Sequence, residues 1–291
     1  MTTTLKYTMK KIIPTLIFSL TMAGCSTLKI TPEVRQQLNQ TQQSIKQAPI
    51  AILANSCMLT NELGRDQILI TPSYTSAEQF NKQLIEQLSQ QGVQVSKIAS
   101  PLICGFMPEE QYKKYDVKAD KKAKRTATTT YPLLNSRDNS LTVEQQNAVL
   151  ELYQFFAASD KISVYNQSNK KSPIPLPILK DETAQTIKSW SNSRYIFVTS
   201  VDGLDASFGN KLVMGTLSAG VGIATYNMGS TFITAYTPKE GQFYSLRLLD
   251  LEQKNTIWSS NGNLKGNVFS YDKHSISAEN ILYPLFEKQP K

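Results

Sequence analysis

The sequence predicts a single mixed α/β domain, in which helices pack on one sheet that contains both parallel and antiparallel strands. Three observations predict this fold: a strand, helix and strand succession over residues 50–98, an apolar run at 195–201, and two strand-like segments around a polar turn near position 253. The domain is expected to span residues 49–291, because roughly 240 residues can fill one hydrophobic core.

The first unit is a strand, helix and strand arrangement. Residues 50–54 and 67–71 are short apolar runs typical of buried strands, and residues 93–98 alternate as a strand does. Before this last strand, residues 76–90 place apolar side chains at helical spacing, which predicts one buried face: Phe80, Leu84, Ile85 and Leu88. A connection of this length returns the chain to a parallel strand through a right-handed crossover.

Two further helices are predicted in the middle of the chain. Residues 142–159 form the first, and its inward side chains are Val149, Leu152, Tyr153 and Phe156. The second begins at Asp181. Between them, prolines at 173, 175 and 177 enforce an extended connection, which is either a spacer or a segment that a partner recognises by its prolines.

The C-terminal third predicts the antiparallel part of the sheet. Residues 195–201 are expected to be a central strand, and residues 244–249 and 256–260 a hairpin. Residues 264–269 are expected to add an edge strand. The chain then closes with a helix over 277–287, whose buried side chains are Ile281, Leu282, Leu285 and Phe286.

The first residues have the layout of a secretory leader. Lys10 and Lys11 precede an apolar run at 12–22, which is too short for a membrane-spanning helix of about 20 residues. Small Ala23 and Gly24 then stand before Cys25. This motif resembles the lipobox of bacterial lipoproteins, although Met22 stands where those proteins usually have leucine, and either Met1 or Met9 is the start.

The lipobox resemblance implies a processing site and a location. Residues 1–24 are a signal peptide in this interpretation, with cleavage between Gly24 and Cys25 and acylation of the Cys25 thiol. Ser26 is not the aspartate that commonly retains such proteins at the inner membrane, so the expected location is the outer membrane, with the domain facing the periplasm. Residues 25–48 are expected to be a polar tether, because Val34, Leu38 and Ile45 form too thin an apolar stripe to dock strongly.

Loss of the leader changes the charge balance. The full chain has 31 basic and 23 acidic side chains, and residues 1–24 contain Lys6, Lys10 and Lys11 but no acid, so the net charge falls from +8 to +5. A periplasmic location excludes nucleic acid as a normal partner. The remaining positive charge favours lipid headgroups or other anionic envelope material, or serves only solubility.

The cysteine count also becomes even after acylation. Cys57 and Cys104 remain, and in an oxidising compartment they are expected to form a disulfide. The alternative is a pair of buried free thiols.

A basic cluster lies in the segment 113–125. It either binds an anionic surface or is a solvated face of a loop or helix. Its members are Lys113, Lys114, Lys118, Lys121, Lys122, Lys124 and Arg125.

An uncharged, glycine-containing segment spans residues 212–238. Its partial alternation of apolar and polar residues is compatible with a packed loop or with a membrane hairpin of an oligomeric barrel.

No residue pattern in the sequence predicts an enzyme, a cofactor or a metal site. His274 is the only histidine, and no nucleophile elbow or phosphate-binding glycine loop is present. Asp202 and Asp205 either form a turn at the end of a strand or contribute to a calcium site. A hydrolase that uses two carboxylates remains an alternative function, because two acidic side chains from distant parts of the sequence can lie together in the fold.

The order of elements in the C-terminal part resembles bacterial envelope lipoproteins related to the curli-secretion lipoprotein. A helix, the strand 195–201, a glycine-rich stretch, and Leu248-Leu249-Asp250 turning into Ile257-Trp258-Ser259 carry the resemblance. The TolB N-terminal domain and the lipoprotein activator of penicillin-binding proteins look similar in fold. In place of the Thr-Gly turn frequent in these relatives, this chain has Lys254-Asn255.

This resemblance implies scaffolding, activation or pore formation. The predicted function is a non-enzymatic outer-membrane accessory or scaffold in envelope assembly, bound to the membrane through its lipid and to an envelope protein partner. The alternatives are a subunit of an oligomeric secretion channel that uses residues 212–238, and a cell-wall hydrolase. Association with copies of itself stays open.

Overall fold

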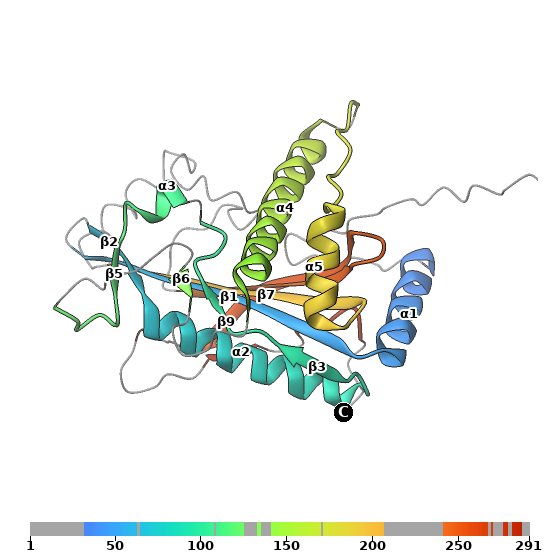
Figure 1. The fold of residues 1–291 in the computed structure, drawn as a ribbon, viewed down its shortest axis with the longest axis horizontal. Helices are drawn as coiled ribbons and strands as arrows, with labels where there is room; N and C mark the ends of the chain where they lie inside the picture. Colours follow the sequence, from blue (N-terminus) through green and yellow to red (C-terminus); the bar gives the residue numbers. More distant parts are fainter. Residues whose placement is uncertain are drawn as a thin grey trace, which may run out of the picture.

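A computed structural model describes residues 32–62, 65–107, 109–124, 133–134, 141–169, 171–206, 241–266, 269, 276–278 and 281–286. The fold is mixed α/β, as the sequence predicts (Figure 1). The elements are α1 (Pro32–Gln47), β1 (Ile50–Glu62), β2 (Arg65–Leu69), α2 (Ile70–Gln90), β3 (Val95–Ile98), β4 (Leu102–Ile103), α3 (Glu109–Tyr112), β5 (Asp116–Lys118), β6 (Leu133–Leu134), α4 (Val143–Ser168), α5 (Asp181–Ser191), β7 (Tyr195–Ala206), β8 (Gly241–Asp250), β9 (Asn255–Gly266) and β10 (Ile276–Ser277).

Strand β1 lies at the centre of the sheet, whose main order is β10-β9-β8-β7-β1-β2-β5. Strand β7 runs parallel to β1 from the pair Ala51 and Ile196 to the pair Asn61 and Ala206. Along its other edge, β1 pairs in succession with parallel β3, parallel β4 and antiparallel β2. The parallel return of the first unit is therefore from β1 through α2 to β3, while β2 forms a hairpin with β1.

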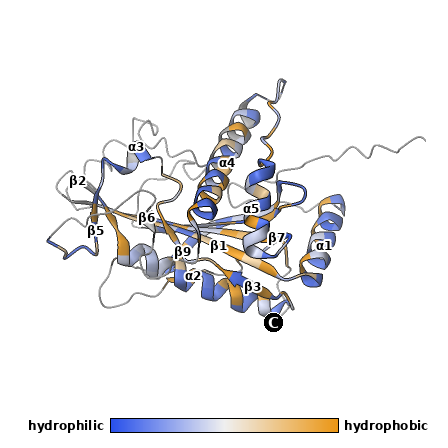
Figure 2. Cartoon of the chain, in the orientation of Figure 1, coloured by the Kyte–Doolittle hydropathy of each residue, from blue (hydrophilic) through white to orange (hydrophobic). Residues whose placement is uncertain are grey.

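Helices cover both faces of this sheet. In Figure 1, α2 lies on one face and α4 and α5 lie on the other. Figure 2 shows hydrophobic residues on the central strands and hydrophilic residues along much of α2 and α5, as burial of one helix face requires. The predicted hairpin is formed by β8 and β9, and the predicted central strand is β7, between β1 and β8.

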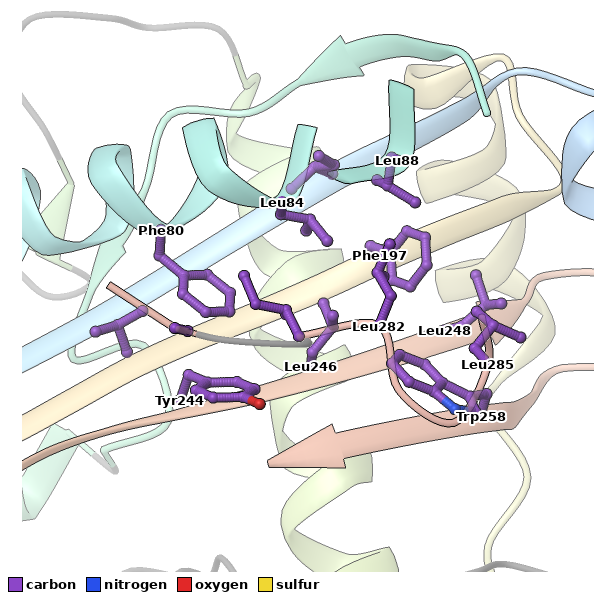
Figure 3. Close-up of a cluster of buried hydrophobic side chains, with 14 of the residues drawn as sticks. Phe80, Leu84, Leu88, Phe197, Tyr244, Leu246, Leu248, Trp258, Leu282 and Leu285 are labelled. Carbon is purple, nitrogen blue, oxygen red and sulfur yellow. The ribbon is translucent and has the colours of Figure 1, made fainter. Parts of the chain in front are cut away.

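The α2 face holds the largest apolar cluster. Phe80, Leu84 and Leu88 of α2 are fully buried against the strands, as their helical spacing predicts. Figure 3 shows them above strand residues such as Phe197 and Leu246. On the opposite face, α4 buries all four of its predicted inward residues against a second cluster. The first turn of α4 is fixed by a capping box between Thr142 and Gln145, because each side chain accepts a hydrogen bond from the other residue's backbone N–H.

The tether prediction is wrong for residues 32–47. They form helix α1, in which Leu38 and Ile45 are buried with 7% and 0% exposure. The surface that receives them comes from the far end of the chain: Gln42 donates a hydrogen bond to the backbone carbonyl of Leu285, and the ammonium of Lys46 lies 5.5 Å from the ring centroid of Phe286. A thin apolar stripe is enough to dock this helix because a complementary apolar surface lies beside it.

The C-terminal predictions need two corrections. Residues 264–269 are not a separate edge strand, because β9 continues to Gly266 and β10 pairs with its end. The four residues predicted to be buried between 281 and 286 are buried, but residues 281–286 form turns rather than a helix. Pro284 lacks the N–H that a helix needs, and a proline also disfavours helical geometry at the preceding Tyr283. Among the helices of the described ranges, none is long and apolar enough to cross a membrane.

Candidate functional site

Cys57 and Cys104 lie beside each other at one end of the strand pair β1 and β4. Asn55 pairs with Leu102 and Ser56 with Ile103, so the register brings Cys57 and Cys104 together. Their Cα atoms are 4.5 Å apart and their sulfur atoms are bonded at 2.05 Å. The bond closes the loop that contains β2, α2 and β3.

A directed chain of hydrogen bonds runs from this disulfide loop across two strands. The backbone N–H of Gly105 donates to Asn55 Oδ1 at 2.7 Å, Asn55 Nδ2 donates to Ser200 Oγ at 2.8 Å, and Ser200 donates to Asp202 Oδ2 at 2.8 Å. A backbone N–H can only donate, so it fixes the orientation of the Asn55 amide and the direction of the remaining bonds. We call these four residues the Asp202 chain.

Close packing around Gly105 explains why a glycine stands there. A Cβ atom at this position would lie 2.9 Å from a ring carbon of Tyr153. The Tyr153 hydroxyl donates to the backbone carbonyl of Ala54 at 3.2 Å, and its ring packs against Gly105. The disulfide loop, α4 and the central strands therefore meet at this point.

The carboxyl group at the end of the Asp202 chain has a raised pKa. Burial raises the pKa of Asp202 to about 7, and the hydrogen bond from Ser200 opposes this shift. Burial, followed by the nearby Asp202 charge, raises the pKa of Tyr153, so this hydroxyl stays protonated. The arrangement can therefore take up and release one proton near neutral pH at Asp202.

The turn interpretation of Asp202 and Asp205 does not fit the structure. Both residues lie inside β7, which continues past the predicted strand end to Ala206. Asp202 accepts from Ser200, whereas Asp205 forms an ion pair with Lys121, and within the described ranges no group of three His, Cys, Asp or Glu residues is arranged to hold a metal. Gly203 is required by close packing, because a Cβ there would lie 2.7 Å from the sulfur of Met58.

The basic cluster is divided among different environments. Lys121 is partly buried between Asp205 and the ring of Phe269, whose centroid lies 5.3 Å from its ammonium. Lys113 pairs with Glu109 at 2.8 Å on the surface, and Lys118 lies in β5. Lys114, Lys122 and Lys124 are exposed, while Arg125 lies outside the described residues. Lys121 thus belongs to the packing of the domain, and the exposed lysines leave a smaller basic surface than the sequence predicts.

The connection between α4 and α5 exposes an apolar surface. We call residues 173–178 the arm. Ile174 and Ile178 of the arm are 44% and 67% exposed, and Tyr165 of α4 is 45% exposed. The Asn166 side chain accepts from the backbone N–H of Ile174 and donates to its carbonyl, both at 2.7 Å, which holds the arm along α4. The proline spacing predicts the extended conformation, but only the fold reveals the exposed isoleucines.

A second surface feature is a groove between α2 and the link from β3 to β4. Its volume is about 400 Å³. Apolar side chains line both walls of the groove, beside charged residues of α2. We define the groove by its lining residues: Tyr74, Glu78, Asn81, Lys82, Ile85, Glu86, Ile98, Ala99, Ser100 and Pro101. Ile98 is 46% exposed there. The arrangement can receive an apolar chain segment.

Gly24, Cys25, His274 and the uncharged segment 212–238 lie outside the described residues. The candidate sites among the described residues are the Asp202 chain, the arm and the groove. No known protein family, curated protein or solved structure matches this chain.

Proposed function

We propose that the chain is an outer-membrane lipoprotein, anchored through Cys25, that acts as a non-enzymatic accessory or scaffold in envelope assembly. The observation that carries the contact role is the arm, an extended and proline-stiffened segment with two exposed isoleucines. A stiff segment loses little conformational entropy on binding, so an apolar surface of this kind suits a protein contact. The leader-like pattern that precedes Cys25 supports the anchor.

Helix α1 sets the distance between the proposed anchor and the domain. Six residues, 26–31, separate Cys25 from the start of α1 at Pro32. A fully extended link of this length reaches at most about 25 Å. The docked helix therefore keeps the start of α1 within about 25 Å of the proposed anchor.

Metabolic labelling tests the anchor. The full chain should incorporate radiolabelled palmitate and fractionate with the outer membrane, and the Cys25→Ala chain should incorporate none. Incorporation that persists in Cys25→Ala, or a parent chain without label, would reject the anchor. A parent chain that fractionates with the inner membrane would reject the location.

Affinity purification tests the contact role. The lipidated chain, isolated in detergent, should retain an envelope protein, and Ile174→Asp should lose it while Val143→Asp retains it. Val143 is a matched control because it is 73% exposed at the other end of α4. Equal retention by both variants would contradict the role of the arm. Recovery of copies of the chain alone would favour the channel alternative.

A further inference from the structure

We infer that the Cys57–Cys104 disulfide and the Asp202 carboxyl are one coupled unit, in which reduction of the disulfide by a dithiol also releases the proton of Asp202. This coupling goes beyond the proposed function, because it needs neither the anchor nor the arm. It follows from three features that meet at one place in the fold: the disulfide, the register of β1 and β7, and the Asp202 chain.

The strand register places the disulfide beside the carboxyl. Cys57 of β1 and Asp202 of β7 are direct partners in the parallel pair. Two positions earlier, the partners Asn55 and Ser200 join their side chains by a hydrogen bond, so both side chains point to the same face of the sheet. Because side chains in a strand alternate with a period of two, Cys57 and Asp202 lie side by side on that face as well.

The other cysteine holds the loop from which the Asp202 chain begins. Cys104 has a φ of 54°, in the left-handed region that residues other than glycine rarely adopt. The next residue is Gly105, whose backbone N–H donates to Asn55. The disulfide therefore helps to fix an unfavourable backbone conformation at the start of the chain. When the bond is broken, Cys104 can relax to a negative φ, which moves the Gly105 N–H away from Asn55.

The surroundings of Asp202 favour the neutral carboxyl while the disulfide is intact. Burial raises the pKa of Asp202 to about 7. The residues that face it from its own strand, from β1, from β8 and from α4 are uncharged: Ser200, Cys57, Phe243 and Tyr153, whose hydroxyl stays protonated because its own pKa is raised.

Charged groups on the neighbouring elements are engaged in ion pairs. Arg247 of β8 lies four residues beyond Phe243 and pairs with Asp160 of α4 at 2.6 Å. Lys121 pairs with Asp205, which is an odd number of residues from Asp202 and therefore lies on the opposite face of the sheet. Burial and the hydrogen bond from the neighbouring serine thus control the protonation of Asp202.

Reduction changes these surroundings in one direction. The new Cys57 thiol can donate a hydrogen bond to the carboxylate beside it, which favours the ionised form. Release of the Gly105 N–H from Asn55 loosens the Asp202 chain and lets water approach, which also favours the ionised form. The pKa of Asp202 is therefore lower in the dithiol form than in the disulfide form. Between these two values, the disulfide form holds the proton and the dithiol form releases it.

The exchange is balanced in atoms and charge. A thiolate of the reductant attacks one sulfur of the disulfide, and the second thiol of the reductant then resolves the mixed disulfide and closes a cyclic disulfide. Two electrons and two protons pass from the reductant to Cys57 and Cys104, which become thiols. In the pH interval between the two pKa values, Asp202 also gives one proton to the solvent and becomes a carboxylate.

Exchange with dithiothreitol tests the coupling. The lipidated full-length chain in detergent is equilibrated with mixtures of reduced and oxidised dithiothreitol at about pH 5.5 and about pH 7.5, below the ordinary pKa of thiols. Free thiols are then trapped by rapid alkylation, and mass spectrometry measures labelling of Cys57 and Cys104. In this range the protons of the exchanging thiols cancel, so only a coupled group makes the equilibrium constant depend on pH.

The equilibrium constant for reduction of the parent chain should rise at least about fivefold from the lower to the higher pH, since each unit of pKa difference permits up to about a tenfold change. The constant for Asp202→Asn should change by less than about twofold. Asp181→Asn is the matched control, because this carboxyl is exposed on α5, and it should behave as the parent chain does.

A second measurement separates local coupling from unfolding. The circular dichroism spectrum of the reduced chain should match that of the disulfide form. An unfolded reduced chain, an equilibrium constant of the parent chain that is equal at both pH values, or an equal rise in Asp202→Asn would overturn the inference. The labelled peptides contain positions 57 and 104, so the result does not depend on acylation of Cys25, and the palmitate experiment can fail independently.

Discussion

Asn55 and Ser200 are 145 positions apart in the sequence and joined by a 2.8 Å hydrogen bond in the middle of the sheet. Both side chains are buried, with 0% and 1% exposure. Because Asn55 also accepts from the Gly105 backbone, this bond links the disulfide loop to the central parallel strands.

Asn55→Leu should lower the free energy of unfolding by about 2 kcal/mol. The substitution leaves the buried Gly105 N–H without its acceptor and removes the hydrogen bond that Ser200 Oγ accepts, although Ser200 still donates to Asp202, and buried unpaired groups are costly. Urea unfolding measures the loss. Ser44→Ala is the control, since it removes an exposed hydrogen bond to Gln40, and an equal loss in both variants would contradict the role of the Asp202 chain.

Asp202 should make stability depend on pH. Its pKa is raised from 3.8 to about 7 in the folded state, so between these values the folded state holds the proton more tightly than the unfolded state. The contribution of Asp202 to stability is therefore complete below pH 4 and decreases as the pH rises to about 7. As the pH rises across this interval, the free energy of unfolding of Asp202→Asn should increase relative to that of the parent chain by on the order of 2 kcal/mol. This value is smaller than the full pKa shift implies because the carboxyl is partly exposed.

Unfolding curves of both chains at several pH values test this expectation. A constant difference between the parent chain and Asp202→Asn from pH 4 to 8 would show that Asp202 titrates normally.

Reduction of the disulfide should destabilise the domain by about 4 kcal/mol, the value expected for closing a loop of this length. The two cysteines are 47 positions apart. The double variant Cys57→Ala with Cys104→Ala should be destabilised similarly, and reductant should have no further effect on it. Mass spectrometry of the alkylated, non-reduced chain checks the premise, because labelling of both thiols would exclude the bond.

Ile45→Ala should lower the free energy of unfolding by about 2–5 kcal/mol and make α1 sensitive to protease. The side chain is fully buried, so its truncation leaves a cavity between α1 and the core. Asn39→Ala is the matched control, since Asn39 is exposed on the same helix. If cleavage near α1 is equally slow in both variants, the helix does not depend on this contact.

Asp160→Ala should cost about 3–5 kcal/mol because it leaves the charge of Arg247 buried without its partner. The two side chains are 10% and 11% exposed and 2.6 Å apart, and the guanidinium lies 4.6 Å from the ring centroid of Phe156. Replacing both residues, as Asp160→Leu with Arg247→Met, should recover much of the loss. Calorimetry compares the variants, and no recovery in the double variant would assign the loss to packing alone.

Sequence patterns predicted the elements that have strong local signals. Helices α2 and α4 follow from apolar spacing, and α5 begins at the predicted Asp181. Strands β7, β8 and β9 follow from apolar runs around a polar turn. These signals are local because burial of one face requires the same side-chain period in any fold. Local pattern does not give the partner of each strand: β2 and β3 both pair with β1, but in opposite directions.

The sequence by itself determined the mixed α/β class and the inward faces of the main helices. The tertiary structure alone decided that α1 docks, that Asp202 lies at the end of a buried hydrogen-bond chain, and that Ile174 and Ile98 stay exposed. Local periodicity indicates which side chains are expected to be buried. It does not show which of them meet a complementary surface, because that surface includes residues such as Leu285 and Ser200, which are distant in the sequence and come close only in the folded chain.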